Sequence, residues 1–150
     1  MKYLKRFNEN LLIEKFEFNE EKSDINNKLY KNLVSISTDC LANLADTFII
    51  EINEFYGYYT LIIWNRKSFT FDSIKDDIIP FILMLNEKGI KIQYNKIIFT
   101  HDEYNSTSIS VDDIIKYENN YDELDNSYFK KWIIKSELSN IKFYFDDDKE

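Results

Sequence analysis

The sequence TFIIEINEFYGYYTLIIWN, residues 47–65, decides the fold of this chain. Two runs rich in isoleucine, tyrosine and phenylalanine flank Gly57, and residues of these types are enriched in β-strands. Glycine adopts the backbone conformations that tight turns require, so the pattern predicts a β-hairpin centred on Gly57. We expect a further short strand at residues 68–71, directly after the hairpin.

An amphipathic helix is predicted before the hairpin. Apolar residues recur at spacings of three and four from Ile25 to Leu44, which places them on one face of a helix over residues 20–45. Before this helix, LLIEKFEF at residues 11–18 alternates in part and predicts an irregular strand. Cys40 lies within the apolar pattern, so we expect its thiol to be buried and unreactive.

A second helix is predicted after the hairpin, where apolar residues again recur at spacings of three and four. Ser73 and Asp76 are spaced as in a helix N-terminal cap, and Gly89 is placed to end the helix. Pro80 falls inside it and removes one backbone hydrogen bond, which predicts a kink or two short helices that meet near Ile79.

The remaining sequence predicts shorter elements. The segment IKIQYNKIIFT, residues 90–100, favours one irregular strand, with a tight hairpin through Asn95 and Lys96 as the alternative. After it we expect a polar loop at residues 101–108 and a short helix from Val111. A further helix at residues 127–138 and a closing strand at residues 141–145 follow.

These patterns predict one α+β domain over residues 1–150, with a mainly antiparallel sheet packed against two or three helices. The chain is 44% hydrophobic and 17% aromatic, enough apolar material for a core without disulfides or a structural metal. It has one cysteine, no apolar stretch of membrane-spanning length and no secretory signal pattern. We therefore expect a cytoplasmic protein that does not bind a membrane.

Negative charge is concentrated in the last third of the sequence. Residues 1–100 contain 14 acidic and 13 basic residues, whereas residues 101–150 contain 13 acidic and 6 basic residues. Between residues 101 and 128, eight carboxylates accompany a single lysine, Lys116, and tyrosines are interleaved with them. Residues 101–128 are called the acidic-aromatic segment below.

Tyrosine supplies a large contact area at low entropic cost, and carboxylates attract lysine and arginine. We therefore predict that the acidic-aromatic segment binds a basic protein partner. The predicted contact residues are Asp102, Glu103, Asp112, Asp113, Tyr117, Glu118, Tyr121, Asp122, Glu123, Asp125 and Tyr128. A solvated, loop-rich flank is the alternative interpretation, since runs of like charge are common on protein surfaces. Direct binding of nucleic acid is disfavoured, because phosphate binding requires clustered cations.

The sequence contains no catalytic signature. His101, Asp102 and Glu103 are the only neighbouring residues suited to proton or metal chemistry, but adjacent residues on an extended segment point in different directions, and the chain has no second histidine. With only two glycines the chain also lacks a phosphate-binding loop. We therefore expect no catalytic residues, metal or cofactor. The remaining alternative is a small-molecule or metal-binding domain that uses His101 and nearby carboxylates.

The segment DEYNSTSISVDDIIKYENNYDELDNSYF, residues 102–129, gives the chain a resemblance to a known class. With this segment, a single small domain, no catalytic motifs and a composition typical of AT-rich codons, the chain resembles the small acidic immunity proteins that neutralise bacterial toxins. Many of those toxins are nucleases. The resemblance implies a non-enzymatic inhibitor that occludes a basic toxin, with a nuclease as the expected partner. Phage inhibitors of host defence nucleases share these features and are the alternative.

Overall fold

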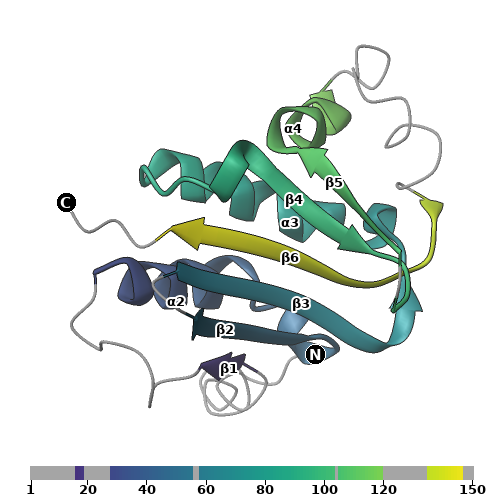
Figure 1. Cartoon of the computed structure of the whole chain (residues 1–150), viewed down its shortest axis with the longest axis horizontal. Coiled ribbons are helices and arrows are strands. Elements are labelled where there is room, and N and C mark those ends of the chain that lie inside the picture. Colours follow the sequence, from purple (N-terminus) through teal and green to yellow (C-terminus); the bar gives the residue numbers. More distant parts are fainter. Residues whose placement is uncertain (1–15, 19–27, 56–57, 104, 120–134, 147–150) are drawn as a thin grey trace.

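The computed structural model describes residues 16–18, 28–55, 58–103, 105–119 and 135–146. They form an α+β fold in which helices pack on a sheet (Figure 1). The strands are β1 (Phe16–Phe18), β2 (Ile49–Phe55), β3 (Tyr58–Phe69), β4 (Lys96–Thr100), β5 (Ser106–Ser110) and β6 (Leu138–Asp146). The helices are α2 (Lys28–Cys40), α3 (Phe71–Glu87) and α4 (Val111–Asn119), with short 3-10 turns η1 (Leu44–Asp46) and η2 (Gln93–Asn95).

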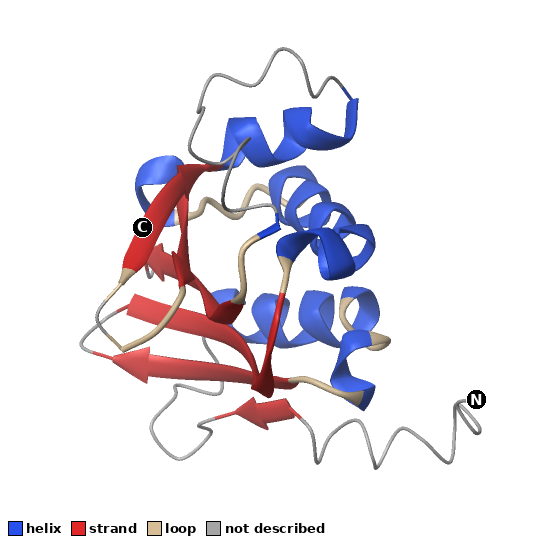
Figure 2. Ribbon diagram, turned by 90° about the vertical axis from the view of Figure 1, so that its right-hand side faces the viewer, coloured by secondary structure: helices blue, strands red, loops and turns tan. Residues whose placement is uncertain are grey.

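The strands form one sheet in the order β1-β2-β3-β6-β4-β5. Strand β1 is parallel to β2, and every other neighbouring pair is antiparallel. The three described helices lie on the same side of this sheet (Figure 2). The sheet therefore has one face covered by helices and one face that no described helix covers.

Burial alternates along the central strands, as expected for a sheet with one covered face. In β6, Ile141, Phe143 and Phe145 are fully buried, whereas Lys142 and Tyr144 between them are half-buried. The same alternation runs along β3, where Tyr59, Leu61 and Ile63 are buried. The hydrophobic core thus lies between the inner face of the sheet and the helices.

The hairpin predicted around Gly57 is confirmed. Strands β2 and β3 pair from Ile49 opposite Trp64 to Phe55 opposite Tyr58. The separate strand predicted at residues 68–71 is wrong, because β3 itself continues to Phe69 and α3 begins two residues later. A helix-capping residue, Thr70, separates the two elements.

Helix α3 confirms the second predicted helix, but it starts earlier than predicted and is not divided into two short helices at Pro80. Its N-cap is Thr70, whose Oγ1 accepts a hydrogen bond from the Ser73 amide at 3.3 Å, while the Ser73 hydroxyl donates to the Thr70 carbonyl at 2.7 Å. Asp76 forms an ion pair with Lys75 at 3.2 Å. The helix continues through Pro80 as a single element. Pro80 is exposed, so water can hydrate the carbonyl that lacks an amide partner.

The end of α3 follows the sequence prediction. Gly89 has a φ of 76°, and its amide donates to the Asn86 carbonyl at 3.0 Å. The next amide, that of Ile90, donates to the Leu85 carbonyl at 2.9 Å. These two bonds form a Schellman motif, which satisfies carbonyls at the helix end and needs a left-handed residue.

Replacement of Gly89 by alanine is expected to destabilise the protein by about 1 kcal/mol. A Cβ at this position would meet no atom within 4 Å, so the whole effect would come from the left-handed backbone and not from a clash. Urea unfolding would measure it, with Asn86→Ala as a control in the last turn of the same helix. Equal stability of the two variants would contradict the left-handed conformation.

Two other predictions need correction. The single strand over residues 90–100 is wrong: Ile92 forms an isolated bridge with Phe145, and η2 separates it from β4. Tyr94 and Asn95 in this turn have φ values of 56° and 55°, which a strand cannot accommodate. The polar loop over residues 101–108 in fact includes the start of edge strand β5.

The remaining expectations are met in part. The first predicted helix ends at Cys40 and is followed by η1, so it does not reach residue 45 as one helix. The closing strand is confirmed and is longer than predicted, because β6 starts at Leu138, where a helix was expected to end. Residues 11–15, 20–27 and 120–134, on which parts of the other predicted elements fall, lie outside the described residues.

Candidate binding surface

The structure describes the side chains of five of the predicted contact residues, on the β4–β5 loop and on α4. These are Asp102, Glu103, Asp112, Asp113 and Tyr117. Glu118 belongs to α4, but its side chain is not described. Tyr121, Asp122, Glu123, Asp125 and Tyr128 lie outside the described residues, and their contact role stays a prediction.

The loop between β4 and β5 is shaped by Asp102. Asp102 Oδ1 accepts two hydrogen bonds from Asn105, one from its backbone amide at 3.1 Å and one from its side-chain Nδ2 at 3.0 Å. The His101 amide also donates to the Asn105 carbonyl at 2.8 Å. Aspartate commonly stabilises turns in this way. Asp102 is exposed, but part of its role is therefore to form the turn, whereas its neighbour Glu103 is simply exposed.

Helix α4 separates two neighbouring carboxylates. The Asp113 amide donates to Ser110 Oγ at 3.1 Å, so Ser110 caps the helix N-terminus. Both Asp112 and Asp113 lie in the first turn, where a negative charge interacts favourably with the helix dipole. Asp113 is only 5% exposed, whereas Asp112 is exposed. Asp112 can therefore contact a partner, but Asp113 does not belong to the exposed surface.

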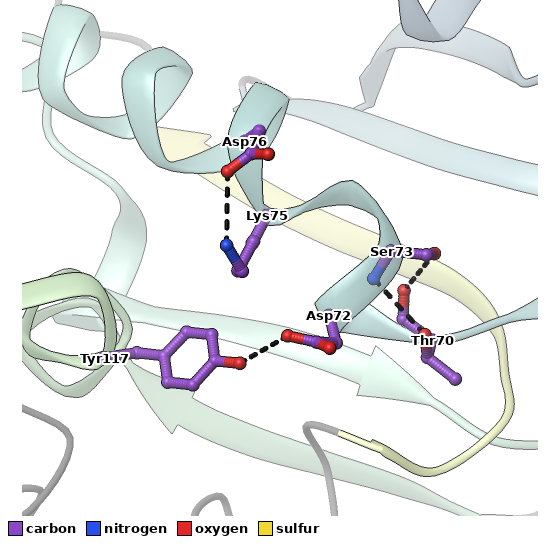
Figure 3. A network of polar contacts seen from close by, with 6 residues as sticks. All are labelled: Thr70, Asp72, Ser73, Lys75, Asp76 and Tyr117. Carbon is purple, nitrogen blue, oxygen red and sulfur yellow. Dashed lines mark hydrogen bonds and ion pairs between the residues drawn. The ribbon is translucent and has the colours of Figure 1, made fainter.

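Tyr117 joins α4 to the start of α3. Its hydroxyl donates to Asp72 Oδ1 at 2.5 Å (Figure 3). Its ring lies 5.8 Å from the ring of Phe71, centroid to centroid. This contact brings an exposed carboxylate from α3 to the end of α4. Asp76 lies one turn further along α3 and is 84% exposed.

Asp112, at the other end of α4, lies beside the C-terminal half of α3, where it lines a hollow with Ile82, Leu85 and Asn86. We call the face of the two helices that carries Asp72, Asp76, Asp112 and Tyr117 the α3–α4 surface; its Asp72 and Asp112 ends are about 15–20 Å apart along α3.

Sequence reasoning missed Asp72 and Asp76, because they lie in the part of the chain where charges nearly balance. Their spacing of four residues would place both on one face of a helix, but the predicted helix began at Ser73 and left Asp72 outside it. The neighbouring Asp77 does not share this role. Burial, and then the charge of Asp76, raise the pKa of Asp77, while a hydrogen bond with Asn43 of the α2–η1 connection lowers it.

The acidic-aromatic segment does not form one continuous patch in the described residues. The register of the hairpin places Thr100 opposite Ser106 at the loop end and Lys96 opposite Ser110 at the α4 end. Four residue steps along a strand span about 14 Å. The carboxylates of the loop and that of Asp112 therefore lie at opposite ends of the β4–β5 hairpin.

Within the described part of the chain, neither His101 nor Cys40 belongs to a recognisable reactive site. His101 Nε2 is buried and has no hydrogen-bond partner among the described residues. In those same residues, no three histidine, cysteine, aspartate or glutamate side chains could jointly hold a metal ion. Cys40 is half-buried, not buried as predicted, because it is the last residue of α2. Burial, and secondarily the charge of Asp39, raise the pKa of its thiol, which disfavours the reactive thiolate.

The described helices include none that is both long and apolar enough to cross a membrane. Comparisons of the chain with protein-family models, with curated proteins and with solved structures gave no significant match.

Proposed function

We propose that this protein is a non-enzymatic inhibitor of the immunity-protein kind, which binds and neutralises a basic toxin, with a nuclease as the leading class of partner. The observation that carries the proposal is the α3–α4 surface. Three exposed carboxylates lie along it, Asp72 and Asp76 near the start of α3 and Asp112 at the start of α4, and the half-buried Tyr117 contacts Asp72. Such a surface is suited to lysine and arginine side chains of a partner.

The charge distribution supports an encounter with a cationic protein. The net formal charge is −8, and residues 101–150 supply most of the excess. Complementary charge accelerates association by orders of magnitude at moderate salt. A nuclease carries a cationic groove for phosphate groups, and an acidic protein that occupies this groove blocks access of the substrate.

The test uses the product of the neighbouring gene, where that product is basic. Both proteins are purified, their affinity is measured by calorimetry, and the nuclease activity of the partner is titrated with this protein. We expect full inhibition at a stoichiometric ratio and an affinity that falls as salt is raised. Binding without inhibition would contradict occlusion, and the absence of binding to any basic neighbour would contradict the proposed class.

A further inference from the structure

Two adjoining hollows meet at Tyr94, at the end of the molecule where α3 leads into β4. One has a volume of about 710 Å³ and is lined by residues of α2, β6 and the α3–β4 connection. The other has a volume of about 500 Å³ and is lined by residues of η2, β4, β5 and β6. Gln93 and Tyr94 line both. These volumes fall in the range of small-molecule sites.

The larger hollow gathers positive charge in a chain whose net charge is −8. Lys28 comes from the start of α2, Lys88 from the C-cap of α3, and Lys91 from the following loop. Among its described lining residues the sole carboxylate is that of Asp146, whose Oδ1 accepts a hydrogen bond from Gln93 Nε2 at 2.6 Å. Three ammonium groups around one hollow repel one another, and a bound anion relieves that repulsion.

Tyr94 presents an aromatic ring between the two hollows. It is 84% exposed, and no other described large apolar or aromatic side chain is as exposed. It also adopts a left-handed backbone conformation, which is uncommon for a bulky residue. Such conformations persist where the surroundings impose them, and they cluster at functional sites. The hydrogen bond from Gln93 to Asp146 ties this turn to β6.

The smaller hollow is suited to a flat ring. Tyr94 and Tyr144 supply aromatic walls, Ile98 adds an apolar surface, and Ser108 adds a hydroxyl. Aromatic side chains stack on nucleic-acid bases with little dependence on which base is present. Lysine is a common phosphate ligand that acts as a point charge. The two hollows thus combine a ring-binding part with a phosphate-binding part.

We propose that these two adjoining hollows together bind a free nucleotide, with its base against Tyr94 in the smaller hollow and its phosphates beside Lys28, Lys88 and Lys91 in the larger one. The site is separate from the α3–α4 surface, and it does not depend on the proposed inhibitory function. It gives the protein a small-molecule ligand as well as a protein partner.

Calorimetric titration with ATP tests the proposal, with inorganic tripolyphosphate and adenosine as partial ligands. We expect the double variant Lys88→Gln/Lys91→Gln to weaken ATP binding by at least about tenfold. The matched control Arg66→Gln/Lys67→Gln removes the same charge at exposed positions outside both hollows and should leave the affinity nearly unchanged. Equal losses in the two double variants, or no ATP binding by the native protein at millimolar concentration, would overturn the site.

The variant Tyr94→Asn tests the contribution of the aromatic ring without changing the backbone conformation of the turn. Asparagine tolerates the left-handed conformation, so the thermal midpoint should not fall. Loss of stacking should nevertheless weaken ATP binding by about tenfold or more. The affinity for tripolyphosphate should not change. Native affinity for ATP in this variant, or a native protein that binds tripolyphosphate or a short single-stranded oligonucleotide more tightly than ATP, would refute a nucleotide site.

Discussion

Replacement of Phe143 by alanine is expected to lower the free energy of unfolding by about 3–5 kcal/mol, a large part of the about 5–15 kcal/mol that is typical of native proteins. Phe143 lies at the centre of β6 and is fully buried. Its ring meets that of Phe81 of α3 edge-on at 5.4 Å and stacks parallel to that of Phe145 at 6.3 Å, centroid to centroid. Truncation would remove these contacts and leave a cavity between the sheet and α3.

The neighbouring residue provides the matched control. Tyr144 lies on the opposite face of β6 and is half-buried, so Tyr144→Ala is expected to cost about 1 kcal/mol or less. Urea unfolding followed by circular dichroism would compare the two variants. Similar losses would mean that the two faces of the sheet contribute equally, contrary to the one-sided core.

The sequence predicted those parts of the fold whose pattern is local. The hairpin around Gly57 and the end of α3 at Gly89 both depend on neighbouring residues alone. Strand β5 could not be predicted in the same way. It is an edge strand of sequence STSIS in which Ile109 is the buried residue, so it lacks apolar alternation. The turn at Tyr94 was also hidden, because tyrosine gives no local signal for a left-handed conformation.

The candidate surface was predictable in composition but not in shape. Charge counting identified Asp112, and the interleaved tyrosines identified Tyr117, yet Tyr117 contacts Asp72, which lies 45 residues earlier. A contact at that separation depends on how α4 packs against α3 and leaves no trace in a local window. The burial of Asp113 was equally hidden, because it follows from the position of that residue in the capped first turn of α4.

The second large effect concerns binding. The double variant Asp76→Lys/Asp112→Lys is expected to weaken the complex with the basic partner. Each carboxylate that is desolvated and paired in the complex should contribute a loss of about 2–5 kcal/mol in binding free energy, and a carboxylate at the rim of the interface a loss of less than about 1 kcal/mol. Both side chains are exposed, so folding should be little affected. The variant spares Asp72, whose contact with Tyr117 joins the two helices.

A control with the same change in net charge distinguishes a local surface from general attraction. Asp39→Lys/Glu87→Lys reverses two exposed carboxylates outside the α3–α4 surface. Long-range steering depends on total charge, so both double variants should slow association and reduce its dependence on salt. Only Asp76→Lys/Asp112→Lys should also speed dissociation, because short-range pairing determines the lifetime of a complex. Surface plasmon resonance at two salt concentrations measures both rates. Equal dissociation rates for the two variants would mean that the partner does not contact the α3–α4 surface, and the acidic residues there would then have only a solvating role.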